Sequence, residues 1–215
     1  DIGICLDGDG DRVVIIDEKG KVLSGEELIY ILAEYYLSEN TIKKGSIVVT
    51  NEIANYGLDI SLKKLGLKLK RVKVGDKNIL KEIIDNKYFF GGEPSGHFIF
   101  KDDILIGDGM TTAIRLLTLI LKKKNKLSML RKGIDLLEVM NINQKIDREK
   151  FYLSQENIYQ KLNKLCKHLD IYYNIRPSGT EPLLRVNLQY DKRNIKVSTL
   201  NKLKTQIIKV ISDAC

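Results

Sequence analysis

The chain contains few of the residues that build disulfide frameworks and zinc sites. Its three cysteines, Cys5, Cys166 and Cys215, lie far apart and form no Cys-x-x-Cys pair. This pattern argues against a disulfide framework and a zinc site, and it predicts a cytoplasmic protein in a reducing environment. Only His97 and His168 are present, which excludes a histidine-rich metal site.

Long apolar segments are also lacking. No run approaches the roughly 20 apolar residues that a membrane-spanning helix requires. Residues 1–9 contain no basic region followed by an apolar stretch, as a secretory signal would. We therefore expect no membrane partner. The sequence begins without methionine and within an expected β-strand, and from this we expect a fragment of a longer protein.

Basic residues outnumber acidic ones. The 36 lysine and arginine residues exceed the 28 aspartate and glutamate residues and give a formal net charge of +8. Such a charge is compatible with nucleic-acid binding. However, the lysines are spread along the chain, and the densest run, residues 122–126, follows an apolar segment, where positive charge suits a helix C-terminus. We favour a solvated surface and no nucleic-acid partner, and keep a basic nucleic-acid binder as an alternative.

Strand-like and helix-like segments alternate over the first 132 residues, which predicts an α/β domain with a largely parallel sheet. Ser24-Gly25-Glu26-Glu27 has the form of a capping box and predicts a helix start. Beyond Lys132 the pattern predicts a smaller α+β domain, with residues 122–132 as the linker. The expected strands are 2–6, 13–16, 46–50, 67–74, 88–90, 98–100, 136–146, 171–175 and 183–190, and the expected helices are 24–38, 58–65, 77–85, 109–121, 154–168 and 198–212.

The first of three loops that indicate chemistry is Asp7-Gly8-Asp9-Gly10-Asp11-Arg12. Three neighbouring carboxylates repel one another unless a cation neutralises them, and glycine lets the backbone wrap tightly around it. Asp7, Asp9 and Asp11 are therefore predicted to bind a hard divalent cation, and a plain acidic turn is the simpler alternative. A calcium loop of the EF-hand kind is disfavoured because Arg12 stands at the position of its required glycine, so Mg²⁺ is preferred.

The second loop is Gly91-Gly92-Glu93-Pro94-Ser95-Gly96-His97. Glu93, Ser95 and His97 are expected to be exposed together between two apolar strands. Carboxylate and hydroxyl groups form hydrogen bonds with vicinal sugar hydroxyls, and an imidazole transfers protons near neutral pH. A glycine-rich turn with a solvated histidine explains the same residues, and both interpretations stay open at this point.

The third loop is Arg176-Pro177-Ser178-Gly179-Thr180-Glu181-Pro182. Arg176 offers a guanidinium fork for phosphate, and the hydroxyls and amides around Gly179 suit an anion nest. The prolines stiffen both ends of the loop. We favour phosphate binding over a plain turn.

In this order and at these separations, the three loops resemble the magnesium, sugar and phosphate loops of the α-D-phosphohexomutase superfamily. The resemblance covers essentially the whole chain. It implies that residues 1–21 end the family's second domain, that residues 22–132 form the third, and that residues 133–215 form the C-terminal domain. The implied fold class is α/β: the end of one α/β domain, a complete α/β mixed-sheet domain and a smaller α+β domain.

The resemblance also implies roles by position. Asp7, Asp9 and Asp11 would hold Mg²⁺, Arg12 would orient phosphate near the metal, and His97 would assist proton transfer. The sugar hydroxyls and the phosphate that is not transferred would be bound by Glu93, Ser95, Arg176, Ser178, Gly179 and Thr180.

Family members transfer phosphate from a phosphoserine to a phosphosugar, and the bisphosphorylated sugar then turns over and returns the other phosphate to serine. The family's nucleophilic serine lies in a Ser-His-Asn-Pro-like loop of the first domain, and nothing in this sequence matches that loop. The chain alone is therefore expected to be inactive, and the missing N-terminal domains are its expected partners.

Residues 72–77, Val-Lys-Val-Gly-Asp-Lys, are similar to a stretch of the phosphoglucosamine mutase group within the superfamily. Pro94 and Lys77 depart from this group, which commonly has glutamine and arginine there. The resemblance implies interconversion of glucosamine 6-phosphate and glucosamine 1-phosphate through a hexosamine bisphosphate. A phosphomannomutase or phosphoglucomutase, or a non-catalytic fragment that binds Mg²⁺ or sugar phosphate, is the alternative.

Overall fold

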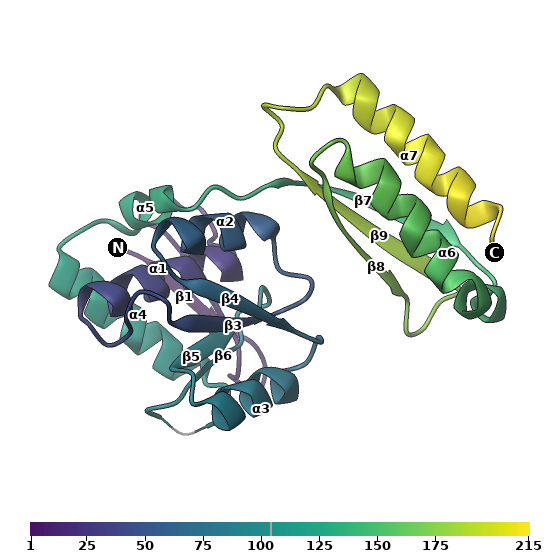
Figure 1. The fold of residues 1–215 in the computed structure, drawn as a ribbon. Coiled ribbons are helices and arrows are strands. Elements are labelled where there is room, and N and C mark those ends of the chain that lie inside the picture. Colours follow the sequence, from purple (N-terminus) through teal and green to yellow (C-terminus); the bar gives the residue numbers. More distant parts are fainter. Residues whose placement is uncertain (104) are drawn as a thin grey trace. The chain divides into compact units, whose positions relative to one another are not determined.

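In the computed structural model, which describes residues 1–103 and 105–215, the chain forms two compact units, residues 1–136 and 137–215 (Figure 1). Both units combine helices with β-sheet, which confirms the predicted α/β fold class. Residues 1–21 belong to the first unit. The predicted assignment of residues 1–21 and 22–132 to two different domains stays a prediction. Within the described ranges, no helix is long and apolar enough to cross a membrane.

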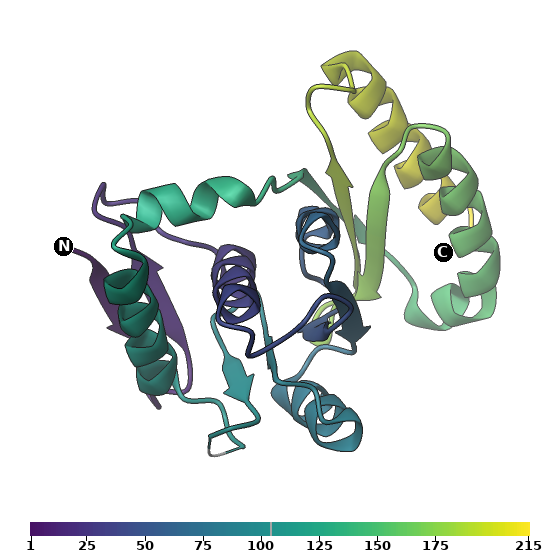
Figure 2. The same ribbon diagram turned by 60° about the vertical axis from the view of Figure 1, so that its left-hand side comes forward.

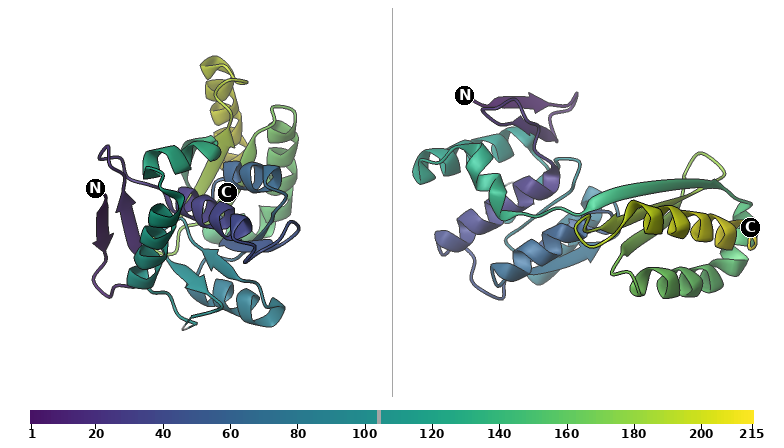
Figure 3. Two further views of the ribbon diagram at one scale, coloured as in Figure 1. Left: turned by 90° about the vertical axis from the view of Figure 1, so that its left-hand side faces the viewer. Right: turned by 90° about the horizontal axis from the view of Figure 1, so that it is seen from above.

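The first unit begins with an antiparallel hairpin of β1 (Gly3–Leu6) and β2 (Val13–Ile16). Helix α4 (Gly109–Lys123) packs against this hairpin (Figure 3, left). The Asp108 carboxylate caps α4 by accepting hydrogen bonds from the N–H groups of Met110 and Thr111, at 2.8 Å and 3.1 Å, which satisfies free amides of the first turn. The acidic loop is thus held between two strands and the start of a helix.

The central sheet of the first unit has the strand order β4-β3-β5-β6. Strand β3 (Ile47–Asn51) runs parallel to β4 (Lys68–Val72) and β5 (Phe90–Gly92), and β6 (Phe98–Phe100) runs antiparallel to β5. The carboxyl ends of the parallel strands therefore meet at one edge of the sheet, where ligands bind in open α/β sheets.

Side chains of this sheet alternate between two cores because successive residues of a strand face opposite sides. Val48 packs with α1 (Gly25–Ser38) and α2 (Tyr56–Lys64). Its neighbour Val49 packs with α3 (Asp76–Asn86) on the other face. Figure 2 shows α1 and α3 on opposite sides of the strands.

Helix α1 begins as predicted, with a capping box in which the Ser24 hydroxyl and the Glu27 carboxylate each accept the other residue's backbone N–H. The expectation of a linker at residues 122–132 is wrong. Helix α5 (Leu127–Leu130) and the 3-10 turn η1 (Arg131–Gly133) belong to the first unit. Arg131 forms ion pairs with Glu27 and Asp17, a distant contact that no local pattern encodes.

The second unit is an antiparallel sheet in the order β7-β9-β8, formed by β7 (Glu138–Lys145), β8 (Tyr172–Pro177) and β9 (Leu183–Tyr190). Helices α6 (Arg148–Lys167) and α7 (Val197–Ser212) lie side by side on one face and close the core (Figure 1). Helix α6 starts before the predicted Ser154 because the Asp147 carboxylate accepts hydrogen bonds from the N–H groups of the first turn.

Candidate functional site

The loop between β1 and β2 brings three carboxylates together. One oxygen from each of Asp7, Asp9 and Asp11 lies within 4.8 Å of the others. The turn requires the φ of +74° at Gly10, a value that favours glycine. The half-exposed Arg12 guanidinium lies beside the cluster, with its Nε atom 3.8 Å from Asp7 and 3.9 Å from Asp11.

This cluster fits a hard divalent cation. The Oδ1 atom of Asp11 is buried and has no hydrogen-bond partner among the described residues. A buried carboxylate oxygen without a partner is costly, and a cation bound by carboxylates would satisfy it. Burial acts to raise the pKa of Asp7, but the backbone N–H of Arg12, a hydrogen bond with Asp11 and the Arg12 guanidinium together lower that pKa below its ordinary value. Asp7 is therefore held in the ionised form that a metal requires.

The predicted magnesium loop (residues 7–12) and the predicted sugar loop (residues 91–97) are joined through their backbones. Arg12 and His97 form an antiparallel β-bridge, and the Val13 N–H donates to the Gly96 carbonyl oxygen at 3.0 Å. Gly96 has a φ of +91°, and a Cβ atom there would lie 2.3 Å from the Val13 carbonyl oxygen. Only glycine fits this close approach, so the glycines of the second loop bring it against the first.

His97 lies in the join between these loops, not on the surface. Its side chain is buried, with the residue only 4% exposed, and Nδ1 lies 3.1 Å from the Oδ2 atom of Asp11. The Nε2 atom faces Gly107, where a Cβ atom would lie 1.9 Å away. The expectation that His97 is exposed is therefore wrong, because the backbone at Gly107 lies against the ring. The observed contact links the imidazole to a predicted metal ligand.

Glu93 is also buried, at 7% exposure, so the expectation of an exposed carboxylate is wrong as well. Its Oε1 atom accepts hydrogen bonds from the Asn51 side-chain amide at 3.0 Å and from the Gly75 N–H at 3.2 Å. Its Oε2 atom accepts one at 3.1 Å from the hydroxyl of Ser95, which is exposed as expected. Glu93 and Ser95 thus lie together, in a fixed arrangement, at the carboxyl edge of the central sheet.

The phosphate loop lies in the second unit, in the turn between β8 and β9. Arg176 is exposed and pairs across the two strands with Arg185, which is also exposed. Gly179 and Thr180 are exposed, whereas Ser178 is buried at 5% exposure. The Ser178 hydroxyl accepts a hydrogen bond from the Arg185 guanidinium at 3.3 Å. Two guanidinium groups beside exposed turn amides can hold an anion.

A family model described as "Phosphoglucomutase/phosphomannomutase, alpha/beta/alpha domain III" matches residues 24–135, more than half of the chain. This chain belongs to the phosphohexomutase family. It is 36% identical over 217 residues to a phosphoglucosamine mutase of Ruminiclostridium cellulolyticum, covering 98% of this chain and 47% of that protein. It is 39% identical over 193 residues to a phosphoglucosamine mutase of Caldanaerobacter subterraneus subsp. tengcongensis, covering 88% of this chain and 43% of that one. The phosphohexomutase chain thus spans about half the length of these curated relatives.

Solved structures share the fold of this phosphohexomutase chain. An N-acetylphosphoglucosamine mutase of Aspergillus fumigatus, in complex with GlcNAc-6P and magnesium, superposes with a TM-score of 0.78 at 18% identity, covering 98% of this chain and 52% of that one. A phosphoglucomutase/phosphomannomutase family protein of Burkholderia thailandensis gives 0.75 at 20% identity, covering 100% and 47%.

Several residues around the predicted loops were not identified from the sequence. In the second unit, Arg148 donates hydrogen bonds to the carbonyl oxygens of Ser178, Gly179 and Glu181 at 2.7, 3.1 and 2.9 Å. Arg185 lies in β9, outside the predicted phosphate loop at residues 176–182. Asn51 ends an apolar strand, and a polar residue at the carboxyl end of a parallel strand was a signal that could have identified it.

Proposed function

We propose that this chain supplies the metal-, sugar- and phosphate-binding parts of a phosphoglucosamine mutase that interconverts glucosamine 6-phosphate and glucosamine 1-phosphate. The observation that carries the proposal is the junction of the acidic cluster with the sugar loop through Gly96 and His97. Identities of 36% and 39% to phosphoglucosamine mutases support the aminosugar as substrate. In the parent protein, residues 1–21 would end the second domain, residues 22–132 would form the third, and residues 133–215 the fourth.

Asp7, Asp9 and Asp11 would hold Mg²⁺, which would neutralise negative charge on the phosphate being transferred. Arg12 lies beside this cluster, and its half-exposed guanidinium would contact a phosphate oxygen near the metal. Glu93 and Ser95 would accept and donate hydrogen bonds to sugar hydroxyls and so orient the ring. His97 would hold Asp11 in place or assist proton transfer, and these two roles are separated by an experiment below.

The phosphate that is not transferred would bind at the second unit. Arg176 and Arg185 offer two charged forks on one face of the β8–β9 hairpin, and the exposed amides of Gly179 and Thr180 complete the anion site. Ser178 would contribute through its hydroxyl, which Arg185 already contacts. Arg148 would stabilise the conformation of this loop through its hydrogen bonds to three carbonyl oxygens.

The nucleophile is expected from the N-terminal domains. No sequence in the chain matches the family's serine loop, and Ser95 and Ser178 lie in binding loops. A phosphoserine of those domains would phosphorylate the aminosugar, and the hexosamine bisphosphate would turn over and return its other phosphate to serine. We also propose a cytoplasmic location, because the three free and dispersed cysteines suit a reducing compartment.

The test is a coupled mutase assay on the full-length protein with Mg²⁺ and a catalytic amount of sugar bisphosphate. Glucosamine, mannose and glucose 6-phosphates would be compared, with Asp9→Asn as the metal-loop control. We expect preference for the aminosugar, and a loss of activity of about 100-fold or more in the control. Preference for mannose or glucose would make the protein a phosphomannomutase or phosphoglucomutase. Binding of sugar phosphate without turnover would leave only a binding role.

A further inference from the structure

We infer that Asn51 is a positioning residue for Glu93, and that the loop from Asn51 to Asn55 is built to hold Asn51 in place. The inference rests on the proposed function, because it takes Glu93 as a ligand of the sugar. It adds a residue outside the three loops to the set that determines sugar binding.

Glu93 depends on donors from other segments. Its carboxyl group is almost fully buried, and a buried polar group needs hydrogen-bond partners, which also hold it in one orientation. Among the described residues, the sugar loop itself contributes one donor to the Glu93 carboxylate, the Ser95 hydroxyl. The donors to Oε1 come from Asn51 and from the backbone of Gly75. Asn51 is therefore the side chain outside the sugar loop that fixes the carboxylate.

The amide of Asn51 is oriented from both of its ends. Asn51 is the last residue of β3 and is only 2% exposed. Its Oδ1 atom accepts a hydrogen bond from the Ile53 N–H at 3.2 Å, so its Nδ2 group faces Glu93. A buried amide that is hydrogen-bonded at both ends has one orientation. Its Nδ2 group therefore holds the Glu93 carboxylate in a fixed position.

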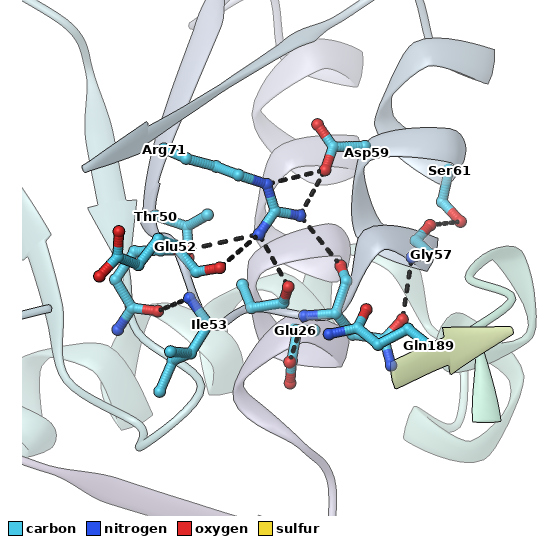
Figure 4. A network of polar contacts seen from close by, with 12 residues as sticks. Glu26, Thr50, Glu52, Ile53, Gly57, Asp59, Ser61, Arg71 and Gln189 are labelled. Carbon is cyan, nitrogen blue, oxygen red and sulfur yellow. Dashed lines mark hydrogen bonds and ion pairs between the residues drawn. The ribbon is translucent and has the colours of Figure 1, made fainter. Parts of the chain in front are cut away.

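Arg71 of β4 fixes the loop that follows Asn51. Its guanidinium donates hydrogen bonds to the carbonyl oxygens of Ala54 at 2.7 Å, Glu52 at 3.4 Å and Asn55 at 3.4 Å. Figure 4 shows this guanidinium pointing into the loop, and Asp59 of α2 accepts hydrogen bonds from its other side. An arginine that spans several carbonyl oxygens and a carboxylate leaves the loop little freedom.

The far end of the loop is fixed by Glu26 of α1. Its Oε1 atom accepts a hydrogen bond from the Asn55 N–H at 2.9 Å, and the Asn55 side chain caps α2 through the Gly57 N–H at 2.8 Å. Three elements, α1, β4 and α2, therefore converge on a loop of five residues whose first member contacts Glu93. Such anchoring exceeds what a connection between a strand and a helix requires, and it suits the support of a binding carboxylate.

The same carboxylate connects the sugar loop to residues 72–77. Gly75 donates its backbone N–H to Glu93 at 3.2 Å and has a φ of +124°, which favours glycine. The segment that resembles phosphoglucosamine mutases therefore reaches Glu93 through a main-chain contact that does not depend on its side chains. Asn51 and Gly75 together set where Glu93 meets the sugar.

The experiment replaces Asn51 by alanine and, separately, by leucine in the full-length protein. The leucine variant keeps most of the volume of the side chain and removes the donor without adding a charge beside Glu93, so it carries the test if the alanine variant fails to fold. Binding of glucosamine 6-phosphate is measured by titration calorimetry, alongside KM and kcat. Asn86→Ala, at an exposed asparagine near the end of α3, is the matched control.

We expect the Kd and KM to rise about 10-fold to 100-fold, because one hydrogen bond to a charged group is lost. Because Glu93 is proposed to bind sugar hydroxyls and not the phosphate being transferred, kcat should change less than about threefold. A folded Asn51 variant whose Kd stays within about twofold of the wild type would overturn the inference. A wild-type protein that binds glucosamine 6-phosphate but turns over no hexose phosphate would refute the proposed activity alone. The Kd values of the wild type and the Asn51 variants would still decide the role of Asn51.

Discussion

Replacing His97 by alanine is expected to weaken metal binding at the Asp7, Asp9 and Asp11 cluster by about 10-fold to 100-fold. The buried imidazole lies 3.1 Å from the Oδ2 atom of Asp11, whose Oδ1 atom is left for the metal. A hydrogen bond to a charged group contributes about 1.5–3 kcal/mol. Removal of a residue that orients a metal-binding carboxylate typically costs 10-fold to 100-fold in metal affinity, and the two estimates agree.

The assay is titration of the full-length protein with Mn²⁺, followed by electron paramagnetic resonance, and with Mg²⁺ by calorimetry. His97→Asn is the conservative variant, because its side-chain amide can place a donor near the position of Nδ1. It should recover most of the affinity. His168→Ala, at the exposed histidine of the second unit, is the matched control and should bind metal normally.

The refuting result is a His97→Ala variant that is folded and binds metal as tightly as the wild type. A second outcome separates the two roles of the imidazole. If His97 serves proton transfer, kcat should fall in both the alanine and the asparagine variants while the metal affinity stays unchanged. If it positions Asp11, metal affinity and kcat should fall together in the alanine variant, and both should recover with asparagine.

Two further changes test other parts of the chain. Asp108→Ala should lower the free energy of unfolding by about 1 kcal/mol, because the cap of α4 is lost. Hydrogen bonds from Thr111 are the main cause that lowers the pKa of Asp108. The stabilisation by Asp108 should therefore be complete above about pH 4 and should be lost as the pH falls through the lowered pKa. Denaturant unfolding of both proteins at several pH values measures this, and a difference in stability that does not change with pH would contradict it. Arg148→Ala should raise the KM for sugar phosphate about 10-fold with a smaller effect on kcat, since the phosphate loop loses three contacts to its carbonyl oxygens. Arg148→Lys, which keeps the charge but not the fork, should recover this only in part, and an unchanged KM for the alanine variant would exclude the role.

Features encoded by neighbouring residues were predictable from the sequence. The capping box at Ser24 and Glu27 is present as expected, because its two partners are separated by one helical turn. The acidic loop was recognised because three carboxylates so close in sequence lie close in space in any compact turn. The mixed α/β fold class followed from the alternation of strand and helix patterns, although the start of α6 at Arg148 did not.

Contacts between distant segments were not predictable in this way. Asn51 and Glu93 are separated by 42 residues and meet only because β3 and β5 are neighbours in the sheet. The sequence pattern places Arg131 in a linker, since nothing nearby shows that Glu27 and Asp17 are its partners. The order of the strands decides these pairs, and that order is a property of the whole unit.

The burial of Glu93 and His97 has a physical explanation that runs opposite to the usual expectation for polar loops. Polar residues between strands are normally exposed, and this expectation led to the error. The Glu93 carboxyl group is buried because Asn51, Gly75 and Ser95 donate hydrogen bonds to its two oxygens in place of water. Gly107 lets the backbone come against the imidazole of His97, and Gly96 lets the loop that carries His97 come against the backbone of Val13. Glycine beside a functional residue is therefore better interpreted as a sign of close packing around that residue than as a sign of an open, mobile loop.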